Sequence, residues 1–454
     1  MRHLAAFALV TTTAALAHAN TWAGVAVFDD HYHLAAWDTL AQGLNHTPYR
    51  PLFGLTLALN YKISGLDLWS YHALQLIAHV FAATCLYGII VSLEPKRRAV
   101  ATVAACIFAA HWVSVDVVTY ITQRCEGMAT ACIFAAVFCY ARNMATDRGA
   151  WLWAATAWVV VGLGFKPIAL TAFGIMLFIH HQKHGGGIVT MYRRQGWWLS
   201  WVLILGGWVL YINRWRVLGY SHVVGIEAHP LADYWTSQCR IMFWYLRRAF
   251  IPEVVAVEPG LLVRAAYQNS PWVLAAIGAA ITAAVLLDRR KWLGVLIWSS
   301  LAILSVTAII PIKDPAWSYR VYGPSAAASV VLAWLAVEAV RCRAAQMAAI
   351  AAVMMASIWT TNRSAMLYHD DMLLWTAATR YAPHSFRSWY NLGYAAYVRH
   401  DYTETIRAAK GAIDAKPSAR AAHRLIADAY LKTGQFDKAR VHLTRSVKMR
   451  KWGS

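Results

Sequence analysis

The sequence predicts an all-α protein, in which a polytopic membrane helix bundle of about 11 spans is followed by a short α-solenoid of helical repeats. The 454 residues are 59% hydrophobic and 14% charged, and their mean hydropathy of +0.41 is too high for a soluble globule of this length. Apolar runs recur through residues 1–361. From residue 362 these runs stop, the charge rises and a 34-residue period begins, which indicates a repeat domain at 362–454.

The apolar runs predict the membrane spans, although several are shorter than a full crossing and are typical of tilted or re-entrant segments. They cover residues 4–28, 71–93, 99–118, 128–140, 151–164, 168–179, 197–212, 272–287, 292–310, 325–340 and 347–359. The first run has two interpretations. Residues 1–19 have the form of a secretory signal peptide that ends in a small-residue cleavage pattern, whereas the whole run is long enough to be an uncleaved span.

Basic residues in alternate short loops predict the orientation in the membrane. They are Lys96, Arg97, Arg98, Arg142, Arg148, Lys183, Arg193, Arg194, Arg289, Arg290, Lys291, Arg341 and Arg343. By the positive-inside rule these loops are cytoplasmic, so the long loops at 29–70 and 213–270 and the repeat domain lie on the outer side. The net charge of +20 therefore reflects membrane orientation, and nucleic acid is not an expected partner. The seven cysteines include no CxxC pair, which indicates buried thiols and no metal site.

The first outer loop carries the candidate active centre. Asp29 and Asp30 are adjacent carboxylates at the expected water line, with His31 and His33 beside them. Low-dielectric surroundings can tune the pKa of such a group, as general-base catalysis requires. The alternative is that the two aspartates only mark a helix end. Helical apolar spacing at 52–63 further predicts an interfacial helix in this loop, and residues 235–250 predict another in the second loop.

Other charged groups lie in the predicted outer turns, where they are costly to place and therefore suggest function. Arg124 and Glu126 occupy one turn, Lys166 a second and Arg320 a third. For Lys166 the alternative is that its side chain only snorkels to the membrane–water interface and has no functional role. His72, Gln75 and His79 follow an i, i+3, i+7 pattern, which predicts a polar stripe facing the bundle interior, with either a structural or a ligand-binding role.

The C-terminal period matches the tetratricopeptide consensus twice. The matching residues are Trp389, Leu392, Gly393, Ala412 and Pro417 in the first unit, and Ile426, Ala427, Tyr430, Gly434, Ala439 and Ser446 in the second. Two repeats bury little core alone. From residue 363 the chain has 16 Lys and Arg against 7 Asp and Glu, so the domain is basic.

Motifs are spread in order along most of the chain, at residues 28–30 (FDD), 49–52 (YRPL), 59–80, 121–126 (ITQRCE), 165–171 (FKPIALT) and 319–325 (YRVYGPS), followed by the repeats. Together they resemble the transmembrane and tetratricopeptide-repeat O-mannosyltransferases and their bacterial relatives, which have the polytopic C-type glycosyltransferase fold. At two positions the chain departs from the family pattern, and both positions lie in turns that are expected to contact the sugar donor. The family usually has Lys-Glu where this chain has Lys166 and Pro167, and Glu-Arg where it has Tyr319 and Arg320.

The resemblance implies transfer of a sugar, with inversion, from a polyprenyl-phosphate carrier to a hydroxyl of a secreted or membrane-anchored protein. It implies Asp29 as the base, and Asp30 or Glu126 as its support. The implied phosphate-binding residues are Arg50, Arg124, Lys166 and Arg320, and the other expected pocket residues are His31, His79, His111, Tyr49, Tyr319 and Tyr322. No cofactor is required, although a divalent metal could bind the acidic pair.

The expected location is a bacterial inner membrane, with the active site and the repeats on the periplasmic side and the protein acceptor held by the repeats. Two alternatives stay open. The acceptor could be a lipid or a cell-envelope polysaccharide, or the chain could be a non-catalytic membrane scaffold that recruits partners through its repeats. Costly charges at the outer mouths argue against a scaffold.

Overall fold

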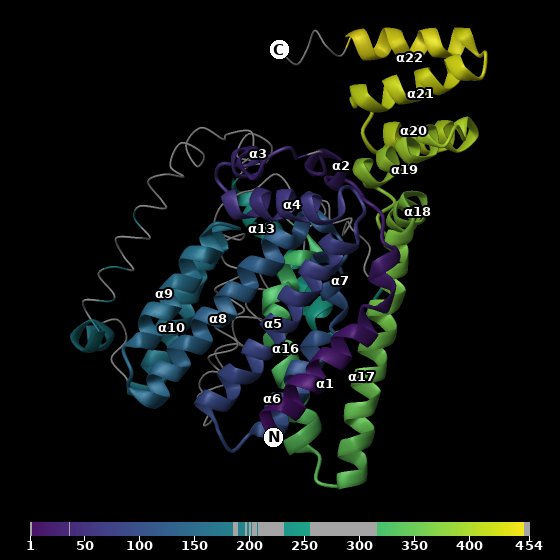
Figure 1. Ribbon diagram of the computed structural model, residues 1–454. Coiled ribbons are helices and arrows are strands. Elements are labelled where there is room, and N and C mark those ends of the chain that lie inside the picture. Colours follow the sequence, from purple (N-terminus) through teal and green to yellow (C-terminus); the bar gives the residue numbers. More distant parts are fainter. Residues whose placement is uncertain are drawn as a thin grey trace. The chain divides into compact units, whose positions relative to one another are not determined.

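The computed structural model describes residues 2–35, 37–184, 189–195, 198, 201, 207, 231–254 and 316–448. Within these residues every regular element is a helix, as the sequence predicts. The described chain divides into two compact units (Figure 1). The first contains residues up to Trp22 and those from Asp29 to Ala365, and the second contains Ala23–Phe28 and the residues from Met366 onward.

Four helical segments among the described residues are long and apolar enough to cross a membrane: Trp69–Leu93, Ile121–Thr146, Ser318–Ala339 and Arg343–His369. They contain α5 (Trp69–Leu93), α8 (Arg124–Thr146), α16 (Tyr322–Trp334) and α17 (Arg343–Met366). A fifth candidate joins α6 (Arg98–Ala109) to residues 112–118 across a bend of 43°. These segments coincide with predicted runs and support an integral membrane protein.

Three further predicted runs form shorter apolar helices: α1 (Arg2–Ala17), α9 (Ala150–Leu163) and α10 (Thr171–His184). The runs at 272–287 and 292–310, and all but three residues of the run at 197–212, lie outside the described residues. The number of spans therefore stays a prediction.

The run predicted at 4–28 is not one continuous helix. After α1 ends, η1 (Ala19–Ala23) forms a single 3-10 segment. The break is fixed by side-chain hydrogen bonds to another turn, because the His18 ring is 2.9 Å from Ser114 Oγ and Thr21 Oγ1 is 2.9 Å from Thr119 Oγ1. Polar residues inside the apolar run thus find partners within the protein instead of continuing the helix.

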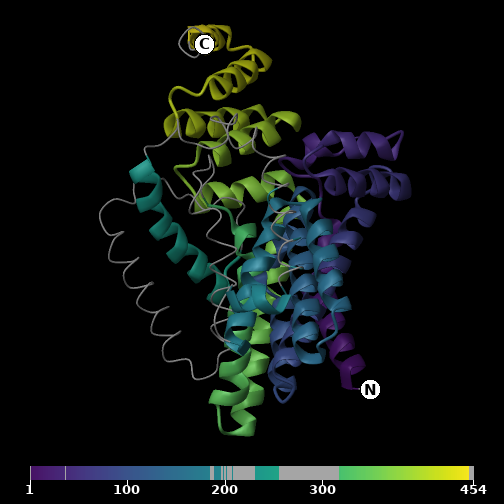
Figure 2. The same ribbon diagram turned by 90° about the vertical axis from the view of Figure 1, so that its left-hand side faces the viewer.

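The central helix of the first unit is α8, which packs against α5, α9 and α10. Both views show these blue helices side by side (Figure 2). Most α8 side chains are buried on all faces, and many are small, including Gly127, Ala129, Ala135 and Ala136. Small residues allow helices to approach closely in a membrane. The position of α8 is consequently fixed by contacts with its neighbours along its whole length.

The segment predicted as the first outer loop contains three helices: α2 (Asp30–His33), α3 (Leu40–His46) and α4 (Pro51–Ser64). The helix predicted at 52–63 is therefore confirmed. It begins at a proline in the first turn, where the missing N–H costs nothing, and it ends at Gly65, whose φ is +62°. Helices α3 and α4 pack at two glycines, because a Cβ built on Gly43 would lie 2.6 Å from the carbonyl oxygen of Gly54.

The helix predicted at 235–250 is also present, as α13 (Leu231–Phe250). Its C-terminal end is attached to the turn that precedes α8. Trp112 Nε1 donates a hydrogen bond of 2.7 Å to the carbonyl oxygen of Arg248, and His111 Nε2 lies 3.1 Å from the carbonyl oxygen of Ala249.

The second unit consists mainly of α18 (Asp371–Tyr381), α19 (Phe386–Val398), α20 (Tyr402–Ala415), α21 (Arg420–Lys432) and α22 (Phe436–Lys448). Each packs against the next along the chain. Helices α19 and α21 begin 34 residues apart, as do α20 and α22, which agrees with the period in the sequence. Trp389 packs against Gly411, where a Cβ would lie 2.6 Å from the indole ring.

The segment at 23–28 belongs to this second unit although it is far away in sequence. The N–H of Val25 donates a hydrogen bond of 2.9 Å to the carbonyl oxygen of Tyr368. The ring of Phe28 lies 5.8 Å from that of Trp375, in an edge-on arrangement. Phe28 has φ +50°, a conformation that a bulky residue adopts only when its surroundings hold it there.

Candidate functional site

Asp30 is fully buried and anchors two distant parts of the chain. Its Oδ1 accepts hydrogen bonds of 2.7 Å and 2.6 Å from the N–H and hydroxyl of Thr122, and its Oδ2 accepts one of 3.3 Å from the N–H of Ile121. These N–H groups begin the short helix η3 (Ile121–Gln123), which leads into α8. Free N–H groups at a helix start favour a negative charge, so the carboxylate of Asp30 caps η3.

Asp29 precedes α2 and, unlike Asp30, is exposed. Its backbone carbonyl accepts hydrogen bonds from the N–H groups of Tyr32 and His33, at 3.0 Å and 3.1 Å, which fix the backbone that carries the side chain. The phenol of Tyr120 lies near both aspartates, and burial together with the charges of Asp30 and Asp29 raises the pKa of Tyr120. One carboxylate is therefore engaged in capping while its neighbour is accessible to solvent.

An ion pair lies at the start of α8. Lys166 Nζ contacts Glu126 Oε2, and the Glu126 side chain is only 1% exposed. Burial alone would lower the pKa of Lys166, but the charge of Glu126 together with the nearby Cys125 and Tyr319 groups outweighs burial, and the pKa lies above its usual value. The ammonium also lies 5.1 Å from the ring centroid of Tyr319. The turn before η4 (Pro167–Leu170) thus brings the lysine over the first turn of α8.

Two arginines complete this cationic group. The guanidinium of Arg320 lies 5.8 Å from the ring centroid of Tyr319, and the charge of Glu126 acts on both Arg320 and Lys166. Arg50 lies within electrostatic reach of Lys166, and its Nη1 is 3.7 Å from the sulfur of Cys125. Lys166 therefore pairs with the buried carboxylate of Glu126, Arg320 lies within its electrostatic reach and Arg50 lies near Lys166, so three cations accompany this one carboxylate.

Arg124 is positioned differently, because its side chain is fully buried. Its Nη1 donates a hydrogen bond of 2.7 Å to Asn60 Oδ1, and its guanidinium lies 5.3 Å from the ring centroid of Tyr71. Its Nε and Nη2 have no hydrogen-bond partner among the described residues. The group thus links the start of α8 to α4 and α5.

The predicted aromatic and histidine residues also separate by exposure. His31 is exposed, Tyr49 is 37% exposed and Tyr319 is half-buried. His79 and Tyr322 are buried and lie 2.8 Å apart between ring nitrogen and hydroxyl. His79 belongs to the polar stripe, and all three residues of that stripe are buried, as predicted.

Some residues of this region were not predicted from the sequence. Thr122 contacts Asp30, and Tyr120 lies near both aspartates. The sequence offers one signal for this contact, which is that Thr122 is a small hydroxyl residue just before a helix. His33, which the sequence places beside the acid pair, has a partner that was not predicted, because its ring nitrogen lies 2.9 Å from that of His46. Burial together with the charges of His46 and Arg50 lowers the pKa of His33 to about 4. Across the described residues, no three His, Cys, Asp or Glu side chains form a group suited to a metal ion.

Stretches of this chain are similar to curated protein O-mannosyl-transferases. TMTC3 of Homo sapiens is 30% identical over 154 residues, which are 34% of this chain and 15% of the relative. TMTC2 of Homo sapiens is 27% identical over 171 residues, and tmtc2 of Xenopus laevis is 25% identical over 169 residues; each match covers 35% of this chain and 20% of the relative.

The matched part thus spans a fifth or less of the length of these relatives. No family model matches the sequence, and no solved structure matches it. The similarity agrees with the resemblance that the motifs indicate.

Proposed function

We propose that the protein is a membrane glycosyltransferase that transfers a sugar from a polyprenyl-phosphate carrier to Ser or Thr hydroxyls of secreted or membrane-anchored proteins. The reaction would take place on the periplasmic side of a bacterial inner membrane. One observation carries the proposal: an exposed carboxylate, Asp29, lies on the same unit as a cluster of three cations and beside a buried, fixed carboxylate, Asp30. The similarity to O-mannosyl-transferases supports the same reaction class.

In this mechanism the hydroxyl oxygen of the acceptor attacks the anomeric carbon, and Asp29 accepts the proton of that hydroxyl. The bond from the anomeric carbon to the phosphate oxygen breaks with inversion, and the carrier phosphate leaves with the electron pair. Asp30 cannot easily share this role while it caps η3, so it positions the loop that carries Asp29. Accessibility and geometry, rather than sequence order, separate the two aspartates.

The leaving phosphate would be held by Arg50, Lys166 and Arg320. Cations fixed around a low-dielectric site stabilise charge that develops on a leaving group, and arginine binds phosphate oxygens through two N–H groups at once. Glu126 keeps Lys166 in place. Because these charges neutralise the phosphate, the mechanism requires no metal ion. We assign Arg124 a positioning role, since its bonds face Asn60 inside the protein.

The helices of the second unit would form tetratricopeptide repeats that hold the acceptor protein. The unit is basic, and repeat arrays present variable surfaces to extended polypeptides. A truncated protein that lacks residues 387–454 should lose modification of a full-length acceptor. Once shown to be monodisperse, it should still hydrolyse the donor slowly.

The proposal is tested first in cells, by mass spectrometry of envelope proteins and glycolipids with and without the gene. Hexose or pentose on Ser or Thr of surface proteins, lost with the gene, supports it; loss confined to glycolipid or polysaccharide overturns the protein acceptor. The purified protein is then compared with Asp29→Asn, which should lose about 10²- to 10⁴-fold in rate. Asp67→Asn makes the same change at another exposed aspartate of this loop and should stay within about twofold of the parent rate.

A further inference from the structure

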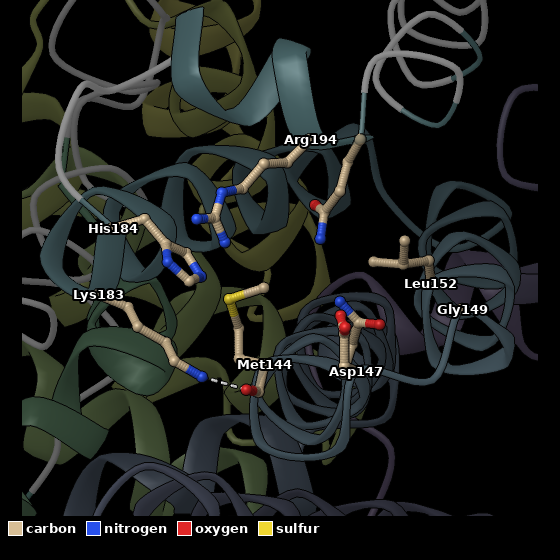
Figure 3. A pocket seen from close by; sticks show the side chains of 9 residues that line it. Met144, Asp147, Gly149, Leu152, Lys183, His184 and Arg194 are labelled. Carbon is tan, nitrogen blue, oxygen red and sulfur yellow. Dashed lines mark hydrogen bonds between the residues drawn. The ribbon is translucent and has the colours of Figure 1, made fainter.

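A second polar site lies at the other end of α8. An open cavity of about 530 Å³ is lined by the C-terminal end of α8, the start of α9, the end of α10 and the helical stretch at 189–195 (Figure 3). It includes Asn143, which is 17 residues beyond Glu126, so the two ends are separated by about 25 Å of helix. The cavity therefore belongs to the face of the membrane opposite the candidate active site, which the positive-inside rule assigns to the cytoplasm.

The lining of this cavity carries two cations, Lys183 and Arg194, and the imidazole of His184. Lys183 and His184 enter it from α10 and Arg194 from the 189–195 stretch, and Figure 3 shows the three side chains directed toward a common space. Among the described residues of the lining, Asp147 is the single acidic side chain. Lys183 also donates to the carbonyl oxygen of Met144, which fixes its ammonium at the end of α8. Burial and the charges of Arg194 and Lys183 lower the pKa of His184, as expected at a site of positive potential.

The same lining includes a buried donor residue, Asn143. Asn143 is 2% exposed, and its Nδ2 has no hydrogen-bond partner among the described residues. A buried donor without an acceptor costs free energy and is uncommon in folded proteins. The neighbouring amide of Gln195 is already engaged, since its Oε1 accepts from the hydroxyl of Tyr140 at 3.3 Å. An anion in the cavity would give Asn143 the acceptor that the protein does not supply.

We propose that this cavity binds the phosphate headgroup of an anionic phospholipid, with Arg194 and Lys183 neutralising the phosphate and Asn143 donating to one of its oxygens. Basic pockets between membrane helices on the cytoplasmic side suit such headgroups. The volume lies within the range of small-ligand sites. The site is separate from the proposed sugar transfer, so it stands or falls independently of that function.

The experiment uses the full-length protein, stripped of lipid in an uncharged detergent. Short-chain phosphatidylglycerol, short-chain phosphatidylcholine and inorganic phosphate are titrated separately, and binding is measured by native mass spectrometry and by the rise in melting temperature. Arg194→Gln should weaken phosphatidylglycerol binding about tenfold or more, as expected for loss of a charge-assisted hydrogen bond. Arg193→Gln is the matched control, because Arg193 is an exposed neighbour outside the lining, and it should change binding less than twofold.

A second variant separates binding from folding. Asn143→Leu should weaken phosphatidylglycerol binding while leaving the lipid-free protein as stable as the parent or more stable, since it removes an unsatisfied buried donor. Tight binding of phosphatidylglycerol with weak binding of phosphate assigns the site to lipid; equal binding of phosphate keeps the anion site but overturns the lipid. Equal losses in Arg194→Gln and Arg193→Gln, or no preference over phosphatidylcholine, overturn the site itself.

Discussion

Replacing Asp30 with asparagine tests whether this carboxylate is an anchor. The new amide could keep the two bonds that Thr122 donates to one oxygen, but its NH₂ group would face the N–H of Ile121. Hydrogen bonds to a charged group contribute about 1.5–3 kcal/mol each. One of these bonds is lost and two lose their charge assistance, while the smaller desolvation cost of a neutral amide offsets part of the loss. We expect the free energy of unfolding to fall by about 2–4 kcal/mol.

The assay is unfolding by SDS in mixed micelles, followed by tryptophan fluorescence, with the parent protein and Asp29→Asn measured in parallel. Asp29 is exposed, so its substitution should change the unfolding free energy by less than about 0.5 kcal/mol. If Asp30→Asn has the same free energy of unfolding as the parent protein, the anchoring role is refuted. If Asp29→Asn were instead the less stable of the two, the division of roles between the aspartates would have to be reversed.

Three further substitutions test other contacts. Lys166→Met leaves the carboxylate of Glu126 buried without its ion-pair partner and should lower the free energy of unfolding by about 3–5 kcal/mol. Adding Glu126→Gln should recover much of this loss. If the two substitutions instead have additive effects on the unfolding free energy, the pairing is contradicted. The pKa of His33 is lowered to about 4, so between about pH 6.5 and 4 the unfolded chain binds a proton that the fold does not. Stability should therefore fall as pH decreases through this window, and less steeply in His33→Gln. Gly411→Ala pushes a methyl group into the indole ring packed there and should destabilise the second unit by about 1–3 kcal/mol, seen as faster limited proteolysis of α19 and α20.

Local sequence patterns predicted much of the helical structure. The proline at the start of α4 and the glycine after it mark the helix that apolar spacing indicates at 52–63. The stripe of His72, Gln75 and His79 is buried because polar groups in an apolar helix are costly against lipid. The positions of α19 to α22 follow the 34-residue period, since each repeat encodes its own helix pair.

Partners from distant segments could not be predicted in this way. The sequence distinguishes Asp29 from Asp30 only by order, whereas their different environments depend on where residues 121–122 pack. The pairing of His33 with His46 likewise depends on how α2 meets α3. Neither contact leaves a local pattern, because each is set by tertiary packing and not by helix period or turn chemistry.

The contact between Asp30 and Thr122 also has a consequence for biosynthesis. The two residues are 92 positions apart, and a ribosome adds about 5–20 residues per second. Asp30 is therefore made roughly 5–20 s before the donors that cap it in the finished protein. During this interval a carboxylate destined for burial must remain hydrated, so the segment that carries Asp30 acquires its final form only after the beginning of α8 has been translated and has reached it.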